Sequence, residues 1–221
     1  GFLGLTITGS VTYYKYGLNS EYNCQSSLGT GTGHMLGSGG MMNMMSSFWF
    51  SNENTSLENY SFIEVKERTE NYLEENNLED LQIVEIMEFS ENFYIEIVER
   101  DTNIGAIELL LDKKTGEVFP EYGPNMMWNT KYGMHTIINS NTDMSIKREE
   151  AIQLGEKYLI SRGTDEFIGE EADEYYGYYT IHTVTRDGDI AGMLSVNGVT
   201  GQVWYHNWHG IFINMEEYEI H

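Results

Sequence analysis

Two stretches of sequence decide the fold: Leu109-Leu-Leu-Asp-Lys-Lys-Thr-Gly-Glu-Val-Phe119 and Leu194-Ser-Val-Asn-Gly-Val-Thr-Gly-Gln-Val-Trp204. The second begins 85 positions after the first, and both have the pattern of an apolar strand, a turn containing Thr-Gly and the start of another strand. An aromatic pair precedes each stretch, Phe93-Tyr94 in the first copy and Tyr178-Tyr179 in the second. A repeat with this spacing predicts that a small domain has been duplicated within the chain.

The residues around each stretch predict one helix followed by antiparallel strands. Ser61-Phe-Ile-Glu64 has capping-box spacing, so we expect the first helix to begin at Ser61. Apolar residues at helical spacing between Ala151 and Leu159, with Gly163 as a stop signal, predict the second helix. The strands are expected over residues 81–89, 93–100, 104–111, 178–185 and 190–196, with a hairpin turn at Asp187-Gly188.

A helix followed by strands that close on Thr-Gly-(Glu/Gln)-Val-(Phe/Trp) resembles the PepSY domain, a small αβββ module found in peptidase propeptides and in many extracytoplasmic proteins. The resemblance covers Ser56 to Gly123 and Ser145 to Ile213. It implies an α+β fold with two αβββ modules, each one helix packed on an antiparallel sheet. PepSY-like proteins share no catalytic residues, so the resemblance informs the fold more than the chemistry.

The chain is accordingly expected to divide into four segments. Residues 1–50 form an extended N-terminal strand and a Gly/Met-rich arm, and residues 51–124 form the first PepSY-like module. Residues 125–144 form a Met-rich linker, and residues 145–221 form the second module.

The charge balance restricts the partners of the protein. The chain has 12 basic and 35 acidic side chains, for a net charge of −23, which repels nucleic acids and anionic membrane surfaces. No run of 18 uncharged apolar residues is present, so we expect no transmembrane span in this form. The chain begins with Gly1, and its first charged residue is Lys15, which suggests a processed, exported protein at the cell surface or outside the cell.

Methionine and histidine are the candidate metal ligands, because thioether and imidazole groups suit copper(I). The alternative for the methionines is adaptable packing of a Gly-rich arm against a neighbouring surface. His206 and His209 have an odd separation, so joint ligation requires a bend after the strand. The candidates are His34, Met35, Met41, Met42, Met44, Met45, Met126, Met127, Met134, His135, His206 and His209.

Calcium is a second candidate ion, because residues 165–174 are rich in Asp and Glu. This segment lacks the ligand order of an EF-hand, and a solvated acidic loop is the alternative interpretation.

The sequence favours a non-enzymatic protein, since the motifs of metalloproteases, serine hydrolases and nucleotide-binding loops are absent from it. We expect an extracytoplasmic assembly protein that polymerises with itself into a filament or surface layer. An exported metal-binding protein is the first alternative, and a peptidase inhibitor, as the PepSY resemblance implies, is the second. The strand that would add to the next subunit includes Phe2, Leu3, Leu5, Ile7, Val11 and Tyr13.

Overall fold

The structure is a computed structural model, and it describes residues 60–134 and 143–219. The described residues all belong to one compact unit. The predicted N-terminal strand and the Gly/Met-rich arm lie outside the described residues.

The first helix, α2 (Phe62–Glu75), begins where the capping box predicts it. The Ser61 hydroxyl accepts a hydrogen bond from the Glu64 amide at 3.3 Å, and the Glu64 carboxylate accepts one from the Ser61 amide at 2.9 Å. These bonds satisfy amide groups that a helix start leaves unpaired. One face of α2, with Val65 and Leu73, is buried in the core.

Four antiparallel strands follow α2 in the first copy. They are β1 (Leu81–Phe89), β2 (Asn92–Glu99), β3 (Gly105–Asp112) and the short β4 (Val118–Pro120). The strand positions predicted from the sequence are confirmed to within one residue. A short helix, α3 (Pro124–Met127), comes next.

The second copy also begins with a helix and ends with three strands that match β2, β3 and β4, but two short strands stand where the first copy has the long β1. It contains α4 (Arg148–Arg162), β5 (Phe167–Ile168), β6 (Asp173–Tyr175), β7 (Tyr178–Val184), β8 (Ile190–Asn197) and β9 (Val203–Tyr205). Helix α4 ends at Gly163 in the left-handed conformation, as predicted, and Gly188 lies in the β7–β8 turn with φ of 92°. The strands β5 and β6 lie in the acidic segment that the sequence did not predict as strand.

The two Thr-Gly turns have the same hydrogen bonds. The carboxylate of Asp112 accepts from the second and third amides after it, at 2.7 and 2.9 Å. The side-chain oxygen of Asn197 accepts from the equivalent amides at 3.0 and 2.8 Å. Gly116 and Gly201 close the turns with φ of 68° and 69°. The repeated sequence therefore adopts a repeated local structure.

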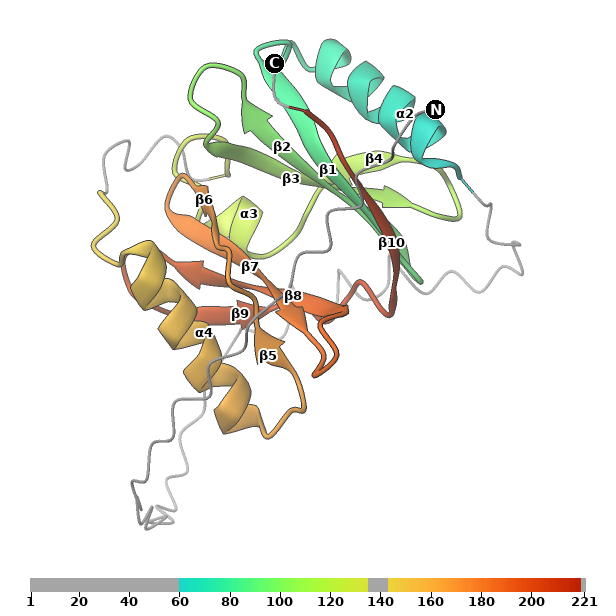
Figure 1. Cartoon of the computed structure of the whole chain (residues 1–221). Coiled ribbons are helices and arrows are strands. Elements are labelled where there is room, and N and C mark those ends of the chain that lie inside the picture. Colours follow the sequence, from blue (N-terminus) through green and yellow to red (C-terminus); the bar gives the residue numbers. More distant parts are fainter. Residues whose placement is uncertain (1–59, 135–142, 220–221) are drawn as a thin grey trace, which may run out of the picture. The chain divides into compact units, whose positions relative to one another are not determined.

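The strands of both copies share one sheet in the described residues, with the order β10-β1-β2-β3-β6-β7-β8-β9. The copies join at two places, and one of them is the parallel pair of Gly105 with Tyr175, between β3 and β6. The strand β10 (Phe212–Glu217) returns to pair antiparallel with β1, although the sequence did not predict it. The result is an α+β fold with a large mixed sheet and few helices (Figure 1).

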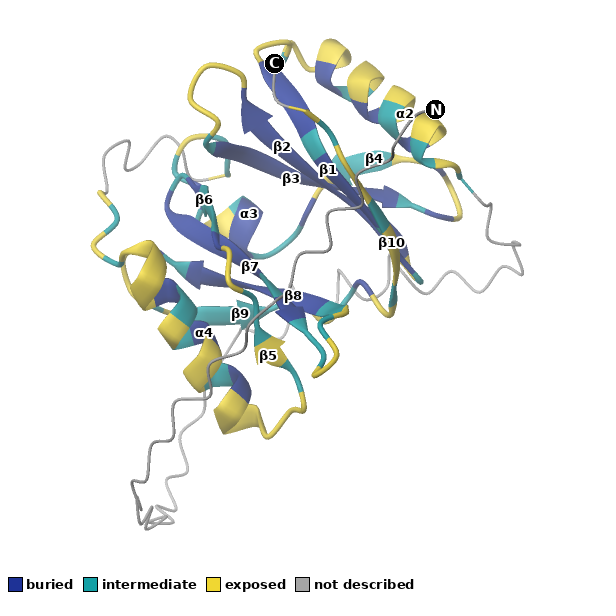
Figure 2. Cartoon of the chain, in the orientation of Figure 1, coloured by how far each residue is buried: buried dark blue, intermediate teal, exposed yellow. Residues whose placement is uncertain are grey.

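Each long helix covers the strands of its own copy, and the buried strands lie beneath them (Figure 2). A third apolar cluster combines residues of β1, β2 and β3 with Met193 of β8. The faces turned away from the helices therefore meet, and this interior holds the candidate site. No helix among the described residues is long and apolar enough to cross a membrane.

Candidate metal centre

Three buried side chains in this interior bring ligand atoms within 4.8 Å of one another: Glu121, His206 and His209. Glu121 Oε1 lies 3.4 Å from His206 Nδ1 and 3.0 Å from His209 Nε2. The exposed fractions of the three residues are 0, 2 and 1 %. The carboxylate comes from the first copy and both imidazoles from the second.

The local chain path explains how the two histidines meet. Strand β9 ends at Tyr205, and the chain then turns before Gly210, whose φ is 83°. This turn supplies the bend that joint ligation requires. Trp208 lies between the histidines in sequence, stacks on His206 at 4.8 Å and donates its indole N–H to Glu121 Oε1 at 3.0 Å.

Glu121 is held by the backbone of the first copy. It follows Pro120 at the end of β4, and its amide donates to the Glu108 carbonyl at 2.8 Å. The side chain of Asn125 donates to the Glu121 carbonyl at 3.2 Å. The carboxylate is thus positioned before any ion binds.

Asn92 determines which nitrogen of His209 faces Glu121. The Asn92 amide nitrogen donates to the Trp208 carbonyl at 3.2 Å, so its oxygen faces His209 Nδ1 at 2.9 Å. Because this oxygen only accepts, His209 Nδ1 carries the proton. The Nε2 lone pair of neutral His209 therefore points at a carboxylate oxygen.

A chain of hydroxyls orients His206 in the same way. Thr180 donates to the Glu108 carboxylate at 2.8 Å and lies 3.1 Å from the Ser195 hydroxyl. Ser195 lies 2.9 Å from His206 Nε2. If each hydroxyl donates toward Glu108, His206 Nε2 donates to Ser195 and its Nδ1 lone pair faces Glu121.

In the described part of the chain, the two imidazoles have no hydrogen-bond partner on the nitrogens that face Glu121, and one oxygen of the carboxylate has none either. Five buried side-chain atoms among the described residues have no partner, and three of them belong to this cluster: Glu121 Oε2, His206 Nδ1 and His209 Nε2. Buried polar atoms are rarely left unpaired, because doing so costs about 1–3 kcal/mol each. The two imidazole nitrogens both face Glu121 Oε1, so a cation bound between them and the carboxylate would give each nitrogen a partner.

The pKa shifts of Glu121 and His209 suit metal binding, whereas the shift of His206 favours its protonated form, whose proton a metal ion would have to displace. Burial raises the pKa of Glu121, but the two histidines outweigh burial and lower it to about 2. Burial lowers the pKa of His209 despite the carboxylate beside it. Burial also lowers the pKa of His206, but Glu121 outweighs this effect and the net shift is upward. An ionised carboxylate and a neutral imidazole are the forms that bind metal ions.

The donor set and its spacing fit a tetrahedral ion. Bonds of about 2.0–2.1 Å to nitrogen and oxygen ligands place neighbouring ligand atoms about 3.3 Å apart in a tetrahedral site. The nitrogen–oxygen distances of 3.4 and 3.0 Å lie close to this value. Asn92 and Ser195 supply the outer hydrogen bonds that commonly orient metal-binding histidines.

Of the predicted metal ligands, the structure brings together only His206 and His209. Met126 is half-buried near the end of α3, whereas Met127 and Met134 are exposed by 52 and 70 %. Other candidates lie outside the described residues: His34, Met35, Met41, Met42, Met44, Met45 and His135. Glu121 was not predicted as a ligand, because its position in the sequence has no ligand-like spacing to either histidine.

The acidic segment 165–174 does not gather its carboxylates in the same way. Within the described residues, the Glu121 cluster is the one group of His, Cys, Asp and Glu side chains that meets the ligand distance. Glu166 instead accepts hydrogen bonds from Thr183 and Tyr205, at 2.8 and 2.9 Å.

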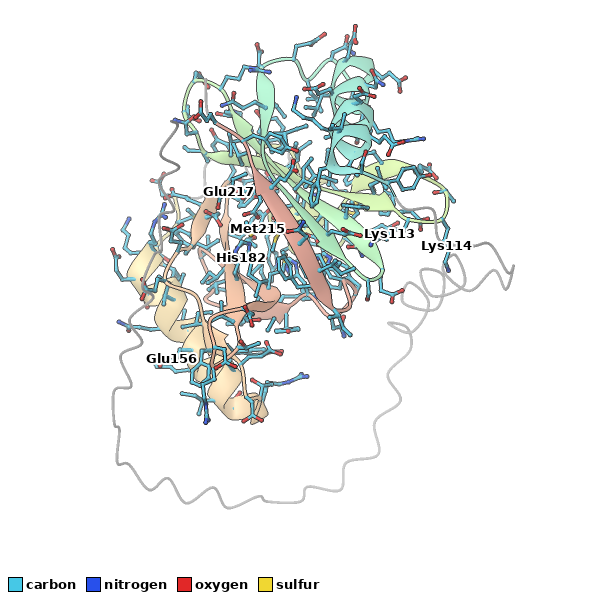
Figure 3. The ribbon with its side chains drawn as sticks, turned by 45° about the vertical axis from the view of Figure 1, so that its right-hand side comes forward. Lys113, Lys114, Glu156, His182, Met215 and Glu217 are labelled. Atoms are coloured by element: carbon cyan, nitrogen blue, oxygen red, sulfur yellow. The ribbon has the colours of Figure 1, made fainter. Side chains whose placement is uncertain are left out.

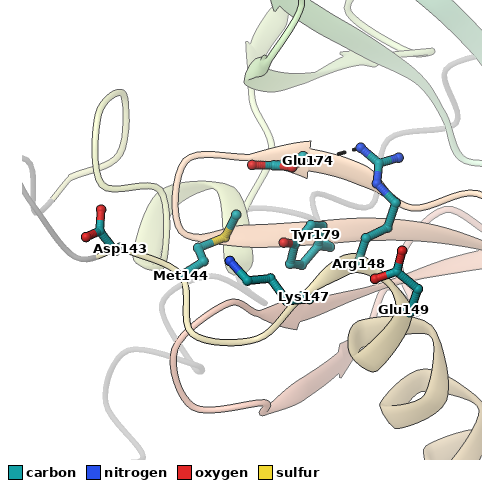
Figure 4. Close-up of a pocket in the computed structure, with 7 residues that line it drawn as sticks. All are labelled: Asp143, Met144, Lys147, Arg148, Glu149, Glu174 and Tyr179. Carbon is teal, nitrogen blue, oxygen red and sulfur yellow. Dashed lines mark ion pairs between the residues drawn. The ribbon is translucent and has the colours of Figure 1, made fainter.

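An open hollow of about 550 Å³ lies at the start of α4 (Figure 4). Lys147 and Arg148 line it, and Arg148 lies 3.9 Å from the carboxylate of Glu174. Both basic side chains are exposed. Unlike the Glu121 cluster, this hollow holds no buried unpaired atom.

No known protein family and no curated protein matches this sequence. Among solved structures, this chain is similar to the Bacillus megaterium YpeB C-terminal domain, with 15 % sequence identity and a TM-score of 0.25. The match covers 66 % of this chain and 62 % of that one, so the chain spans less than two thirds of the solved structure's length. The functional conclusions therefore depend on the geometry of this chain.

Proposed function

We propose that this chain is an exported, non-enzymatic metal-binding protein built from two PepSY-like modules. The site is formed by Glu121, His206 and His209, and the observation that supports it most directly is that an unpaired nitrogen of each buried imidazole faces the Glu121 carboxylate. The repeated helix–strand order and the two matching turns support the modular part of the proposal.

The burial of the site argues for a structural or regulatory ion. All three ligands are at most 2 % exposed, so a substrate has no route to the ion without opening of the interior. The ion would cross-link the two copies, because Glu121 follows β4 and the histidines follow β9. Closed sites of this type contribute directly to folding stability.

The ligand atoms favour Zn²⁺ within the class of divalent transition ions. Two imidazoles and one carboxylate are a common zinc donor set, and Cu²⁺ accepts the same ligands. Copper(I), which the methionine clusters predict, prefers thioether and thiolate ligands. The Glu121 cluster contains neither.

The test is a zinc titration of the full chain after dialysis against a chelator, followed by competition with a chromophoric chelator. We expect one tightly bound Zn²⁺ per chain and a rise in the thermal midpoint on zinc binding, because the ion binds only the folded state. Glu121→Gln preserves side-chain volume and should weaken binding at least tenfold, with far-UV circular dichroism to verify folding.

His182→Ala is the matched control, since His182 lies on β7 outside the cluster. It should bind zinc as the native chain does. Equal zinc uptake by the native chain and by Glu121→Gln would show that the cluster is not the site. A parallel copper(I) titration of the native chain and of Met127→Leu/Met134→Leu tests the methionine prediction separately.

Self-assembly is a second proposal, because the outer side of β10 has no strand partner in the described residues. Peptidase inhibition stays a prediction from the PepSY resemblance, and we find no feature of the described residues that favours it.

A further inference from the structure

Strand β10 is one of the two end strands of the sheet in the described residues, and β9 is the other. Strand β10 pairs with β1 on one side, and no described strand pairs with its other side. Figure 3 shows it crossing the front of the molecule, with Met215 and Glu217 labelled along it. An unpaired edge offers a row of backbone donors and acceptors to another strand.

The register shows which peptide groups face outward. The Tyr218 amide donates to the Val84 carbonyl at 2.8 Å, and the neighbouring pair in the ladder is Glu85 with Glu217. In an antiparallel ladder, residues bonded to the neighbour alternate with residues whose peptide groups point away from it. The peptide groups of Met215 and Glu217 therefore face away from β1.

The side chains along this edge divide into an apolar and an acidic end. Ile211 and Ile213 are exposed by 76 and 53 %, which is high for isoleucine. Glu216 and Glu217 are exposed at the other end. A strand that fits this edge needs apolar residues followed by a neutral or basic end.

We propose that β10 accepts the N-terminal segment Phe2–Lys15 of a second copy of this chain as an added strand. The segment is rich in β-branched and aromatic residues, is uncharged up to Tyr14 and ends in Lys15. In a parallel arrangement that sets Lys15 beside Glu217, Val11 lies beside Ile213, and the apolar residues from Phe2 to Ile7 extend past the start of β10.

Charge argues against the other obvious occupant, a second β10. If two β10 strands paired antiparallel, Glu216 and Glu217 of each copy would find no basic side chain on the opposite strand. The net charge of −23 on each chain would add to the repulsion. The N-terminal segment adds no negative charge. Residues 16–59 are long enough to reach a neighbouring molecule, since an extended chain spans up to about 3.3–3.6 Å per residue.

The first test measures the mass of the full chain by light scattering over a range of concentrations, at low and high salt. The native chain should associate with increasing concentration, more strongly in high salt, and Ile211→Glu/Ile213→Glu should shift association to at least tenfold higher concentration. Ile63→Glu/Ile160→Glu is the matched control, because these residues are exposed by 70 and 72 % on the helices. It adds the same charge and should associate as the native chain does.

The second test identifies the donor. Full chains carrying Cys24→Ser and Val11→Cys are mixed with tagged full chains carrying Cys24→Ser and Ile213→Cys, and a mild oxidant is added. A disulfide between tagged and untagged chains is the expected result. Any one of three results would overturn the proposal. The native chain could stay monomeric at every concentration, the Ile211→Glu/Ile213→Glu variant could associate like the control, or the mixed disulfide could fail to form.

Discussion

Each imidazole at Glu121 is oriented by a hydrogen bond on its far side. Asn92 holds the proton of His209 on Nδ1, and Ser195 contacts His206 at Nε2. The nitrogens that face the carboxylate are therefore set by residues outside the Glu121 cluster. Such outer partners commonly set metal affinity.

Replacing Asn92 with Ala should weaken zinc binding about 10–100-fold, because His209 loses the acceptor that orients its ring. Competition with a chromophoric chelator measures the change. Asn76→Ala is the control, since Asn76 is exposed at the end of α2 and far in sequence from the site. An Asn92→Ala affinity equal to that of the control would remove Asn92 from the site.

Glu99 should control part of the acid stability. Burial raises its pKa, but hydrogen bonds outweigh burial and lower it from 4.5 to about 2. The unfolded chain therefore binds a proton at this group before the folded chain does, and its stabilising effect is lost as pH falls from about 4.5 to about 2. The donors to Glu99 are Lys131, Tyr132, Tyr176 and Thr102.

Urea unfolding of the native chain and of Glu99→Gln, followed between pH 2 and pH 7, provides the measurement. The native chain should be the more stable near neutral pH, and the difference in unfolding free energy should shrink toward pH 2. Glu67→Gln on the exposed face of α2 is the control and should change stability little. A difference that is independent of pH would contradict the role of Glu99.

The candidate site was only half predictable at this scale. His206 and His209 are close in sequence, so their spacing could be recognised and the necessary bend stated in advance. Glu121 is one of 35 acidic residues and lies in the other copy. Pairing between strands that are far apart in the sequence brings Glu121 to the histidines. Such long-range pairing produces no recognisable pattern in the residues around Glu121.

The helices and long strands were largely predictable, because their signals are local. The capping box at Ser61, the stop at Gly163 and the Thr-Gly turns each involve neighbouring residues. Strand β10 has six residues, and none of them is buried, so it shows no clear alternation of buried and exposed positions. It becomes a strand through pairing with β1, which the sequence pattern does not reveal.

The turn glycines should differ in their tolerance of a side chain. Gly163→Ala should cost about 1–2 kcal/mol of unfolding free energy, since φ is 66° and a Cβ there meets nothing within 4 Å. Gly116→Ala should cost more, because its Cβ would also lie within 2.9 Å of the Tyr60 ring carbon that bears the hydroxyl. Urea unfolding measures both, and equal costs would show that Tyr60 moves aside freely.

The whole molecule carries far more negative than positive charge, so its compact state is under electrostatic repulsion. Added NaCl should raise the urea midpoint of unfolding, because the screening length falls from about 30 Å at about 0.01 M salt to about 3 Å at about 1 M. The net charge of −23 makes this effect larger than in a neutral protein. The measurement is made with EDTA present, which separates screening from metal binding, and a midpoint that falls with salt would contradict it.

The return of β10 to β1 also affects how the chain is made. Ile211 bonds to Ser90 across 121 positions of sequence, and Phe212 packs against Phe89. During synthesis, the first copy leaves the ribosome with the edge of β1 open and Phe89 uncovered. A nascent chain whose synthesis stops before Phe212 therefore has an unpaired sheet edge at β1. Such chains should depend on chaperones until β10 is synthesised and pairs with β1.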